Sequence, residues 1–200
     1  MTRIDGAAED TDIGRDDHVE RFPGDPDMWL FVVFESLVFT SYFCIYLYSR
    51  TQHEPEFLAA QSALTISLGI VQTVILLTSS WAIARCVQET RAARYTTAQR
   101  FAFVTTGLGV AFFAIKIAEW VHLIGDGHTF TSSDFMQHYF FLTSIHAIHL
   151  IIGFVALGVL VRQLSDPGRR SARTIETCST YWHTVDLFWV VIFALLYIVR

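Results

Sequence analysis

The chain has 200 residues, of which 52% are hydrophobic and only 16% are charged, and its mean hydropathy is +0.41. Soluble domains usually contain about 25% charged residues, so the composition argues against a soluble domain and favours a single membrane domain. The net charge of −5, with no basic stripe interleaved with aromatic residues, argues against nucleic acid as a partner.

The first 27 residues differ from the rest of the chain. They are acidic and contain almost no apolar stretch, and no basic segment precedes an apolar one as in a cleaved signal peptide. A segment with so few and scattered apolar residues cannot bury enough surface to fold. We therefore predict that residues 1–27 form an acidic disordered tail and that residues 28–200 form the membrane domain.

Five apolar runs are each long enough to cross a bilayer as a helix, because about 20 residues span a hydrocarbon core of about 30 Å. The runs are continuous rather than alternating, which disfavours membrane strands, and a helix satisfies its own backbone hydrogen bonds in lipid. The sequence thus predicts an all-α, polytopic membrane protein. The five predicted helices cover about residues 28–48, 62–84, 101–124, 138–161 and 181–199.

The arginines indicate how these helices cross the membrane, because cytoplasmic loops are enriched in Lys and Arg. With five crossings, one side receives eleven arginines, the other side receives Arg50 and Arg200, and the loop over 125–137 has neither Lys nor Arg. We therefore expect the N-terminus and its acidic tail in the cytoplasm and the C-terminus outside. The eleven are Arg3, Arg15, Arg21, Arg85, Arg91, Arg94, Arg100, Arg162, Arg169, Arg170 and Arg173.

The first two predicted helices carry polar side chains at membrane depth. Glu35 lies in the first helix among phenylalanines, and ionisable groups in lipid are expensive and seldom accidental. Two interpretations of Glu35 stay open: it hydrogen-bonds a neighbouring helix, or it handles protons. The second helix carries small polar residues that are expected to pack against and bond neighbouring helices. These are Gln72, Thr73, Thr78, Ser79 and Ser80.

Lys116 and Glu119 lie three residues apart in the third predicted helix. Residues at this spacing share a helix face, which predicts an ion pair between them, with a substrate or ion site as the alternative. His183 and Asp186 have the same spacing at the start of the fifth helix, and we expect a hydrogen bond between the imidazole and the carboxylate.

His146 and His149 share one face of the fourth predicted helix. A metal site needs three or four ligands, and no HExxH motif, ExxH motif or third ligand accompanies the two histidines, so no metal ligand is predicted. We expect both histidines to hydrogen-bond neighbouring helices, with Glu119 as a plausible partner.

Motifs of redox or hydrolytic chemistry are missing from the sequence. Cys44, Cys86 and Cys178 form no CxxC or CxxCH motif, and there is no Gly-rich phosphate loop or GxSxG motif. No catalytic residue is therefore predicted. The residues alone indicate a five-helix membrane protein that is a subunit of a complex.

Short motifs in all five predicted helices resemble subunit III of the haem–copper oxidases, the family of cytochrome c oxidase subunit III. They are WLFVVFESLVFTSYF from Trp29, QTVILLTSS from Gln72, AEW from Ala118, SIHAIHLIIG from Ser144 followed by VRQL from Val161, and STYWHTVDLFW from Ser179. They occur in the family's order and span about residues 24–199. The last motif, similar to the family's YWHFVDxxW signature, is the most specific.

The resemblance implies a tilted five-helix bundle that supports a catalytic haem–copper subunit I and other oxidase subunits. It further implies that the chain itself carries no haem or copper, that it binds phospholipid and that it sustains proton uptake. By position, Glu35 resembles the family's carbodiimide-sensitive glutamate, and Arg162 resembles an arginine that faces lipid phosphate. Lys116, Glu119, His146, His149, His183 and Asp186 are then expected to form a structural polar network.

Several residues depart from the family's pattern. Gln72 stands where asparagine is usual, Ala147 replaces a glycine between the histidines, and Lys116 is an uncommon intramembrane cation. The opening sequence PGDPDMW, from Pro23, resembles the branch associated with nitric oxide reductase gene clusters. The resemblance therefore leaves open whether the partner reduces O2 or NO.

Three hypotheses for the function follow. The first is a non-catalytic accessory subunit of a cytochrome c oxidase-type complex in a bacterial plasma membrane, with a nitric oxide reductase system as the alternative partner. The second is a stand-alone metal-dependent membrane enzyme, suggested by the eight histidines. The third is a stand-alone proton channel or transporter, suggested by Glu35 and Lys116, although no inverted repeat or proline-broken helix pair is visible.

Overall fold

The computed structural model describes residues 26–199, and every described element is helical. In chain order these are α1 (Pro26–Gln52), α2 (Glu54–Gln61), α3 (Ile66–Arg91), α4 (Tyr95–Gly125), α5 (Asp134–Ser165), α6 (Ala172–Phe193) and a π-helical turn, η1 (Ala194–Ile198). All of them except α2 belong to five segments that are long and apolar enough to cross a membrane. The predicted all-α, five-helix fold is confirmed, whereas residues 1–25 of the predicted tail and Arg200 lie outside the described residues.

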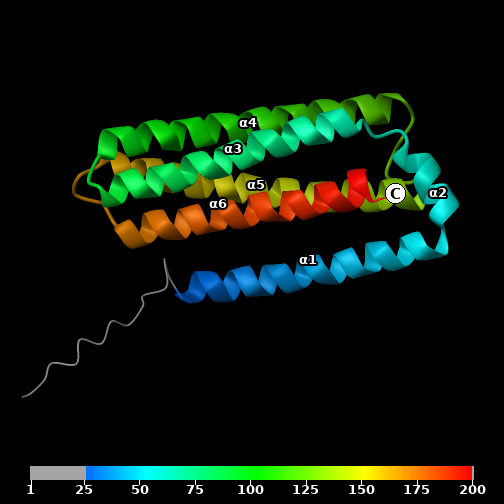
Figure 1. The fold of residues 1–200 in the computed structure, drawn as a ribbon, viewed down its shortest axis with the longest axis horizontal. Coiled ribbons are helices and arrows are strands. Elements are labelled where there is room, and N and C mark those ends of the chain that lie inside the picture. The colour runs from blue at the N-terminus through cyan, green and yellow to red at the C-terminus, as the bar shows by residue number, and fades with distance from the viewer. Residues whose placement is uncertain (1–25, 200) are drawn as a thin grey trace, which may run out of the picture.

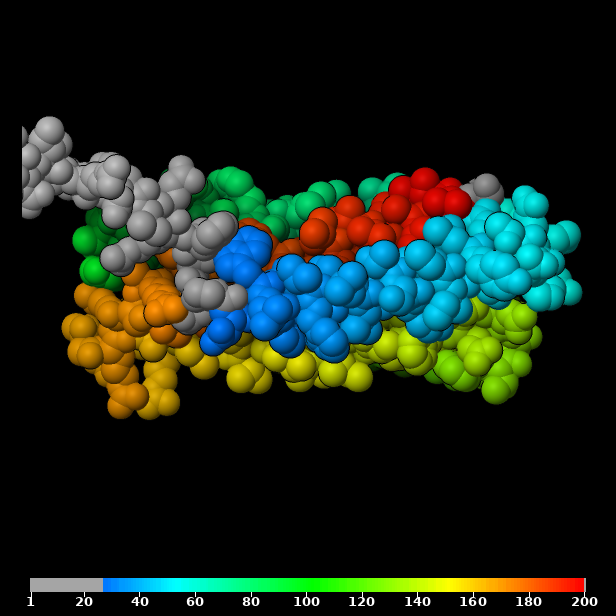
Figure 2. Space-filling view, turned by 90° about the horizontal axis from the view of Figure 1, so that it is seen from below, coloured from blue at the N-terminus to red at the C-terminus, as the bar shows by residue number. Residues whose placement is uncertain are grey.

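Four of the helices form the body of the molecule. Helices α3, α4, α5 and α6 pack in a closed ring in which each contacts two others, α3 with α4 and α6, and α5 with α4 and α6. Helix α1 runs along one side of this ring and is joined to it at one end by the short α2 (Figure 1). Seen from below, α1 covers the middle of this face, with α5 and α6 visible on either side (Figure 2).

The helices are longer than the predicted apolar runs, because hydropathy marks the part of a helix in hydrocarbon and not its polar ends. Helix α6, for example, begins at Ala172 rather than near residue 181. Its start is set by Ser171, whose hydroxyl accepts a hydrogen bond from the backbone N–H of Thr174 at 3.3 Å. Ser133 caps α5 in the same way, as serine commonly does.

The short helix α2 was not predicted. Its eight residues are too few and too polar to register as an apolar run. Proline at its start and the buried Phe57 on its inner side explain why it forms and where it docks. The Phe57 ring contacts those of Tyr46 and Phe135, so α2 closes one end of the molecule over α1 and α5.

The two ends of the molecule differ in charge. The α3–α4 and α5–α6 connections lie at the same end as the start of α1, and α2, the α4–α5 connection and η1 lie at the other (Figure 1). Within residues 26–199 the first end carries all the arginines but Arg50. We call the two ends the arginine-rich end and the arginine-poor end.

Trp182 packs closely against glycines of two other helices. A Cβ added at Gly109 of α4 would lie 2.8 Å from the Trp182 ring, and one added at Gly153 of α5 would lie 3.0 Å from it. The indole N–H donates to the Ser79 hydroxyl of α3 at 3.0 Å, and that of Trp189 donates to the Thr73 hydroxyl at 3.2 Å. Two of the small polar residues of α3 therefore bond a neighbouring helix, as expected for membrane helices.

Candidate functional site: buried polar side chains between the helices

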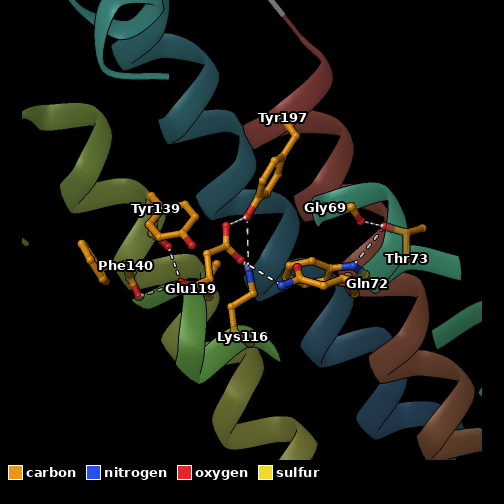
Figure 3. Close-up of polar contacts among 10 residues, drawn as sticks. Gly69, Gln72, Thr73, Lys116, Glu119, Tyr139, Phe140 and Tyr197 are labelled. Carbon is orange, nitrogen blue, oxygen red and sulfur yellow. Dashed lines mark hydrogen bonds and ion pairs between the residues drawn. The ribbon is translucent and has the colours of Figure 1, made fainter. Parts of the chain in front are cut away.

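Lys116 and Glu119 form a buried ion pair in the ring, with 2.7 Å between Lys116 Nζ and Glu119 Oε2 (Figure 3). The distance agrees with the pairing that the spacing predicts. Gln72 Nε2 donates to the same oxygen at 2.9 Å, and the Tyr197 hydroxyl donates to Oε1 at 2.6 Å. Lys116 Nζ also donates to that hydroxyl at 3.1 Å. We call Gln72, Lys116, Glu119 and Tyr197 the Lys116 centre.

Aromatic rings surround the ammonium group of Lys116. Its Nζ lies 4.5 Å from the centre of the Trp189 ring and 5.5 Å from those of Tyr139 and Tyr197. Cations are attracted to ring faces at such distances, and more strongly where water is excluded. The Lys116 centre therefore compensates a buried charge with a carboxylate, a hydroxyl and ring faces contributed by three helices and η1.

The sequence predicted that Gln72 bonds a neighbouring helix, and its hydrogen bond to Glu119 of α4 confirms this, but Tyr197 was not predicted at all. The i,i+3 rule pairs residues of one helix and gives no information about which side chains of other helices face the pair. Tyr197 reaches it from η1, whose wider turn is closed by a hydrogen bond from Val199 N to Ala194 O at 3.0 Å. A tyrosine near the end of an otherwise apolar run is the one signal that could have pointed to it.

Glu35 and His149 form a second polar contact, between α1 and α5. Glu35 Oε2 lies 3.1 Å from His149 Nε2, and His149 Nδ1 lies 2.9 Å from the carbonyl oxygen of Ile145. A carbonyl oxygen only accepts hydrogen bonds, so Nδ1 carries a proton. The hydrogen bond between Glu35 and Nε2 then holds one shared proton, which belongs either to the carboxyl or to the imidazole.

His146 does not bond a neighbouring helix. It is 1% exposed and packs against the rings of Phe112 and Trp189, at centroid distances of 5.8 and 5.3 Å. Neither ring nitrogen has a hydrogen-bond partner within the described chain. The expected hydrogen bond of His146 is therefore wrong, because aromatic rings rather than polar groups face it. Glu119 is not the partner of either histidine, because it bonds Lys116, Gln72 and Tyr197 instead.

The predicted bond between His183 and Asp186 is also wrong. His183 Nδ1 lies 2.6 Å from the Ser80 hydroxyl of α3. Asp186 is 2% exposed, and over residues 26–199 neither of its carboxyl oxygens is hydrogen-bonded. The imidazole of His183 faces α3 because Ser80 offers it a short hydrogen bond there. His183 also lines a cleft of about 230 Å³ between α3 and α6, together with Arg91 and Glu176.

The remaining predicted site residue, Arg162, lies exposed in the last turn of α5 at the arginine-rich end. Nowhere in the described part of the chain do three His, Cys, Asp or Glu side chains converge as they would around a metal ion. His146 and His149 share a helix face but contact different surroundings, aromatic rings in one case and Glu35 in the other.

These features define a multi-pass helical membrane protein in which several buried polar side chains, those of Gln72, Thr73, Ser79, Lys116 and Glu119, bond side chains of other helices. The chain belongs to the cytochrome c oxidase subunit III family, whose model matches residues 20–200. The resemblance seen in the sequence motifs is thereby confirmed.

Several characterised proteins are similar to the chain along most of its length. Cytochrome c oxidase subunit 3 of Bacillus sp. (strain PS3) is 28% identical over 174 residues, which cover 85% of this chain and 83% of the relative. Cytochrome bo(3) ubiquinol oxidase subunit 3 of Pseudomonas aeruginosa is 28% identical over 198 residues, or 96% and 93% of the two chains. The heme-copper oxidase subunit I+III of Aeropyrum pernix is 26% identical over 195 residues, which cover 91% of this chain and 24% of that protein.

Proposed function

We propose that the chain is a non-catalytic accessory subunit III of a haem–copper oxidoreductase of the cytochrome c oxidase type, acting in respiratory electron transport. The observation that carries this proposal is the family match over residues 20–200. The relative from Aeropyrum pernix is named as subunit I+III, which supports a catalytic subunit I as the direct partner. Haem and copper then belong to that partner and not to this chain.

Affinity purification from native membranes tests this assignment. A tag at the end of this chain should bring down a larger subunit in stoichiometric amount, and the purified complex should show the optical spectrum of haem. Recovery of this chain alone, from membranes in which a haem–copper oxidase is present and active, would contradict the proposal.

The position of the complex in the cell forms part of the proposal. The α3–α4 and α5–α6 connections carry arginines and lie at the same end of the bundle. Cytoplasmic loops are enriched in Lys and Arg. We therefore place the arginine-rich end in the cytoplasm and the C-terminus outside, in a bacterial plasma membrane.

Glu35 is proposed to support proton uptake by the partner. The shared proton of the Glu35–His149 contact supports this role, because it can lie on either the carboxyl or the imidazole and its departure breaks only this one hydrogen bond. Glu35→Gln keeps the shape of the side chain and replaces its ionisable carboxyl group by an amide. Assembly should survive while proton uptake per turnover falls, and unchanged uptake per assembled complex would assign Glu35 a structural role only.

Arg162 is proposed to bind a phospholipid phosphate. It is exposed at the arginine-rich end, where head groups lie. Arg162→Ala should lower the phospholipid retained after detergent washing. Arg169→Ala is the matched control, because Arg169 is exposed at the same end but is engaged by Asp166 at 3.0 Å. Equal lipid content in the two variants would refute this role of Arg162.

The gas reduced by the partner is a separate question, since PGDPDMW resembles the branch associated with nitric oxide reductase gene clusters. We propose O2 reduction, because relatives from Bacillus sp. (strain PS3) and Pseudomonas aeruginosa are named as oxidase subunits. O2 and NO consumption by the purified complex distinguishes the two, and turnover with NO alone would make the nitric oxide reductase assignment the correct one.

A further inference from the structure

A groove opens at the arginine-poor end between the α2–α3 connection and α4. It has a volume of about 280 Å³ and is lined by Thr65, Leu68, Ala118, Glu119, His122 and Asp126 among others. Its ionisable residues, Glu119, His122 and Asp126, are spaced by three and four residues and therefore form one stripe along α4. We call these three residues the acidic stripe. At its mouth, His122 Nδ1 lies 3.1 Å from Asp126 Oδ2.

Glu119 connects this groove to the Lys116 centre. It lines the groove, yet it is only 7% exposed, and its carboxylate holds Lys116 and Tyr197 on the other side. It lies six positions before the end of α4 at Gly125, a depth of about 9 Å at 1.5 Å per residue. The groove therefore leads from the polar end of the helix to the buried ion pair.

Unpaired polar atoms lie around the inner side of the centre. Gln72 Oε1, the Tyr139 hydroxyl and both ring nitrogens of His146 are buried, and no described group hydrogen-bonds them. The Trp189 ring links two parts of this region, because it lies 5.3 Å from the His146 ring and 4.5 Å from Lys116 Nζ. Buried polar atoms nearly always find a partner, and ordered water commonly supplies it where side chains do not.

We propose that the groove is a hydrated vestibule through which water and small cations, hydrated protons included, reach Glu119 from the arginine-poor end. The acidic stripe attracts cations, and water that passes Glu119 supplies partners to Gln72, Tyr139 and His146. This role goes beyond support of a catalytic subunit. It places a site with aqueous access on the opposite side of the membrane from the proposed proton uptake.

Two cysteine substitutions one residue apart test the vestibule in the intact complex in native membranes. Ala118 lines the groove, whereas the neighbouring Ile117 is exposed outside it, on the lipid-facing surface. Cys44, the one exposed native cysteine in the described chain, is first replaced by serine. A membrane-impermeant trimethylammonium-ethyl methanethiosulfonate is then added separately to each side of sealed vesicles.

Only a thiolate reacts with this reagent, and thiolates form in water rather than in hydrocarbon. Ala118→Cys should therefore be modified at least about tenfold faster than Ile117→Cys, and only from the arginine-poor side. Equally slow labelling of the two cysteines, or labelling of Ala118→Cys from the arginine-rich side, would overturn the proposal.

A charge comparison tests the attraction of cations. The cationic reagent should modify Ala118→Cys faster than an anionic sulfonate reagent of the same size, and Glu119→Gln should lower that ratio. Because loss of Glu119 disturbs a buried ion pair, Asp126→Asn at the exposed mouth is the second variant and should also lower the ratio without loss of fold. A ratio that neither substitution changes would overturn the acidic stripe as the cause.

Discussion

The Lys116 centre and the Glu35–His149 contact solve the same problem in different ways. The side chains of Lys116 and Glu119 are 2% and 6% exposed, and both oxygens of Glu119 are hydrogen-bonded. Glu35 and His149 are 15% and 16% exposed and share a single hydrogen bond. The cost of a charge rises as water is withdrawn, so the deeper pair needs more partners and the shallower pair tolerates fewer.

The two regions also differ in how much of the fold depends on them. Over the most apolar window of α1 only 11% of the residues are buried, compared with 56% for the segment that contains α6. Helix α1 is attached by a few defined contacts, such as the Phe39 ring stacked 4.2 Å from that of Phe188 and the Tyr46 hydroxyl that donates to Leu195 O. The centre should therefore control the stability of the whole ring, and the Glu35–His149 contact only the docking of α1.

The largest effect is expected from breaking the buried ion pair. Lys116→Met leaves the Glu119 carboxylate without its counter-charge and should lower the free energy of unfolding by about 3–5 kcal/mol. Adding Glu119→Gln should restore part of this loss, because both charges are then gone. Unfolding in detergent of the two single variants and the double variant measures the coupling, and additive losses would show that the two side chains do not act as a pair.

Tyr197→Phe should have the next largest effect. It removes a hydroxyl that donates to Glu119 at 2.6 Å and accepts from Lys116 at 3.1 Å. A hydrogen bond to a charged group contributes about 1.5–3 kcal/mol. Because Lys116 and Glu119 still pair in this variant, we expect a total loss in that range by the same unfolding measurement. A loss no larger than that of Tyr48→Phe, whose side chain is exposed on α1, would exclude Tyr197 from the centre.

Gly109→Ala tests the tight packing of the ring apart from its charges. The new methyl group would lie 2.8 Å from Trp182, and overpacking of this kind costs about 1–3 kcal/mol. Gly107→Ala on the same helix is the control, because nothing lies within 4 Å of a Cβ there. If both variants unfold alike, the packing of α4 on Trp182 is looser than described.

The smallest effect is expected at the contact with α1. Glu35→Ala removes one hydrogen bond and should lower the free energy of unfolding of the ring by no more than about 0.5–1.5 kcal/mol. It should loosen α1, so that limited proteolysis cuts the segment around His53 faster. Loss of the whole fold in this variant would mean that the two regions are not separable.

The sequence predicted those parts of the structure that depend on one helix at a time. Apolar runs located the five membrane segments, and the i,i+3 spacing located the Lys116–Glu119 pair. The same spacing failed for His183 and Asp186, because Ser80 of another helix offered the imidazole a better partner. Which face each helix turns to its neighbours is decided by packing, for example by Trp182 against Gly109 and Gly153, and no local pattern records it.

We propose that the buried polar groups of this chain hold helices together and help to dock a larger redox partner, and that they carry out no redox reaction. The most direct test is to express the chain by itself, purify it folded, and measure its optical spectrum and its consumption of O2 and NO with an electron donor. We expect no haem absorbance and no turnover until the partner subunits are present. Haem bound by the chain alone, or reduction of either gas by it, would contradict a non-catalytic role.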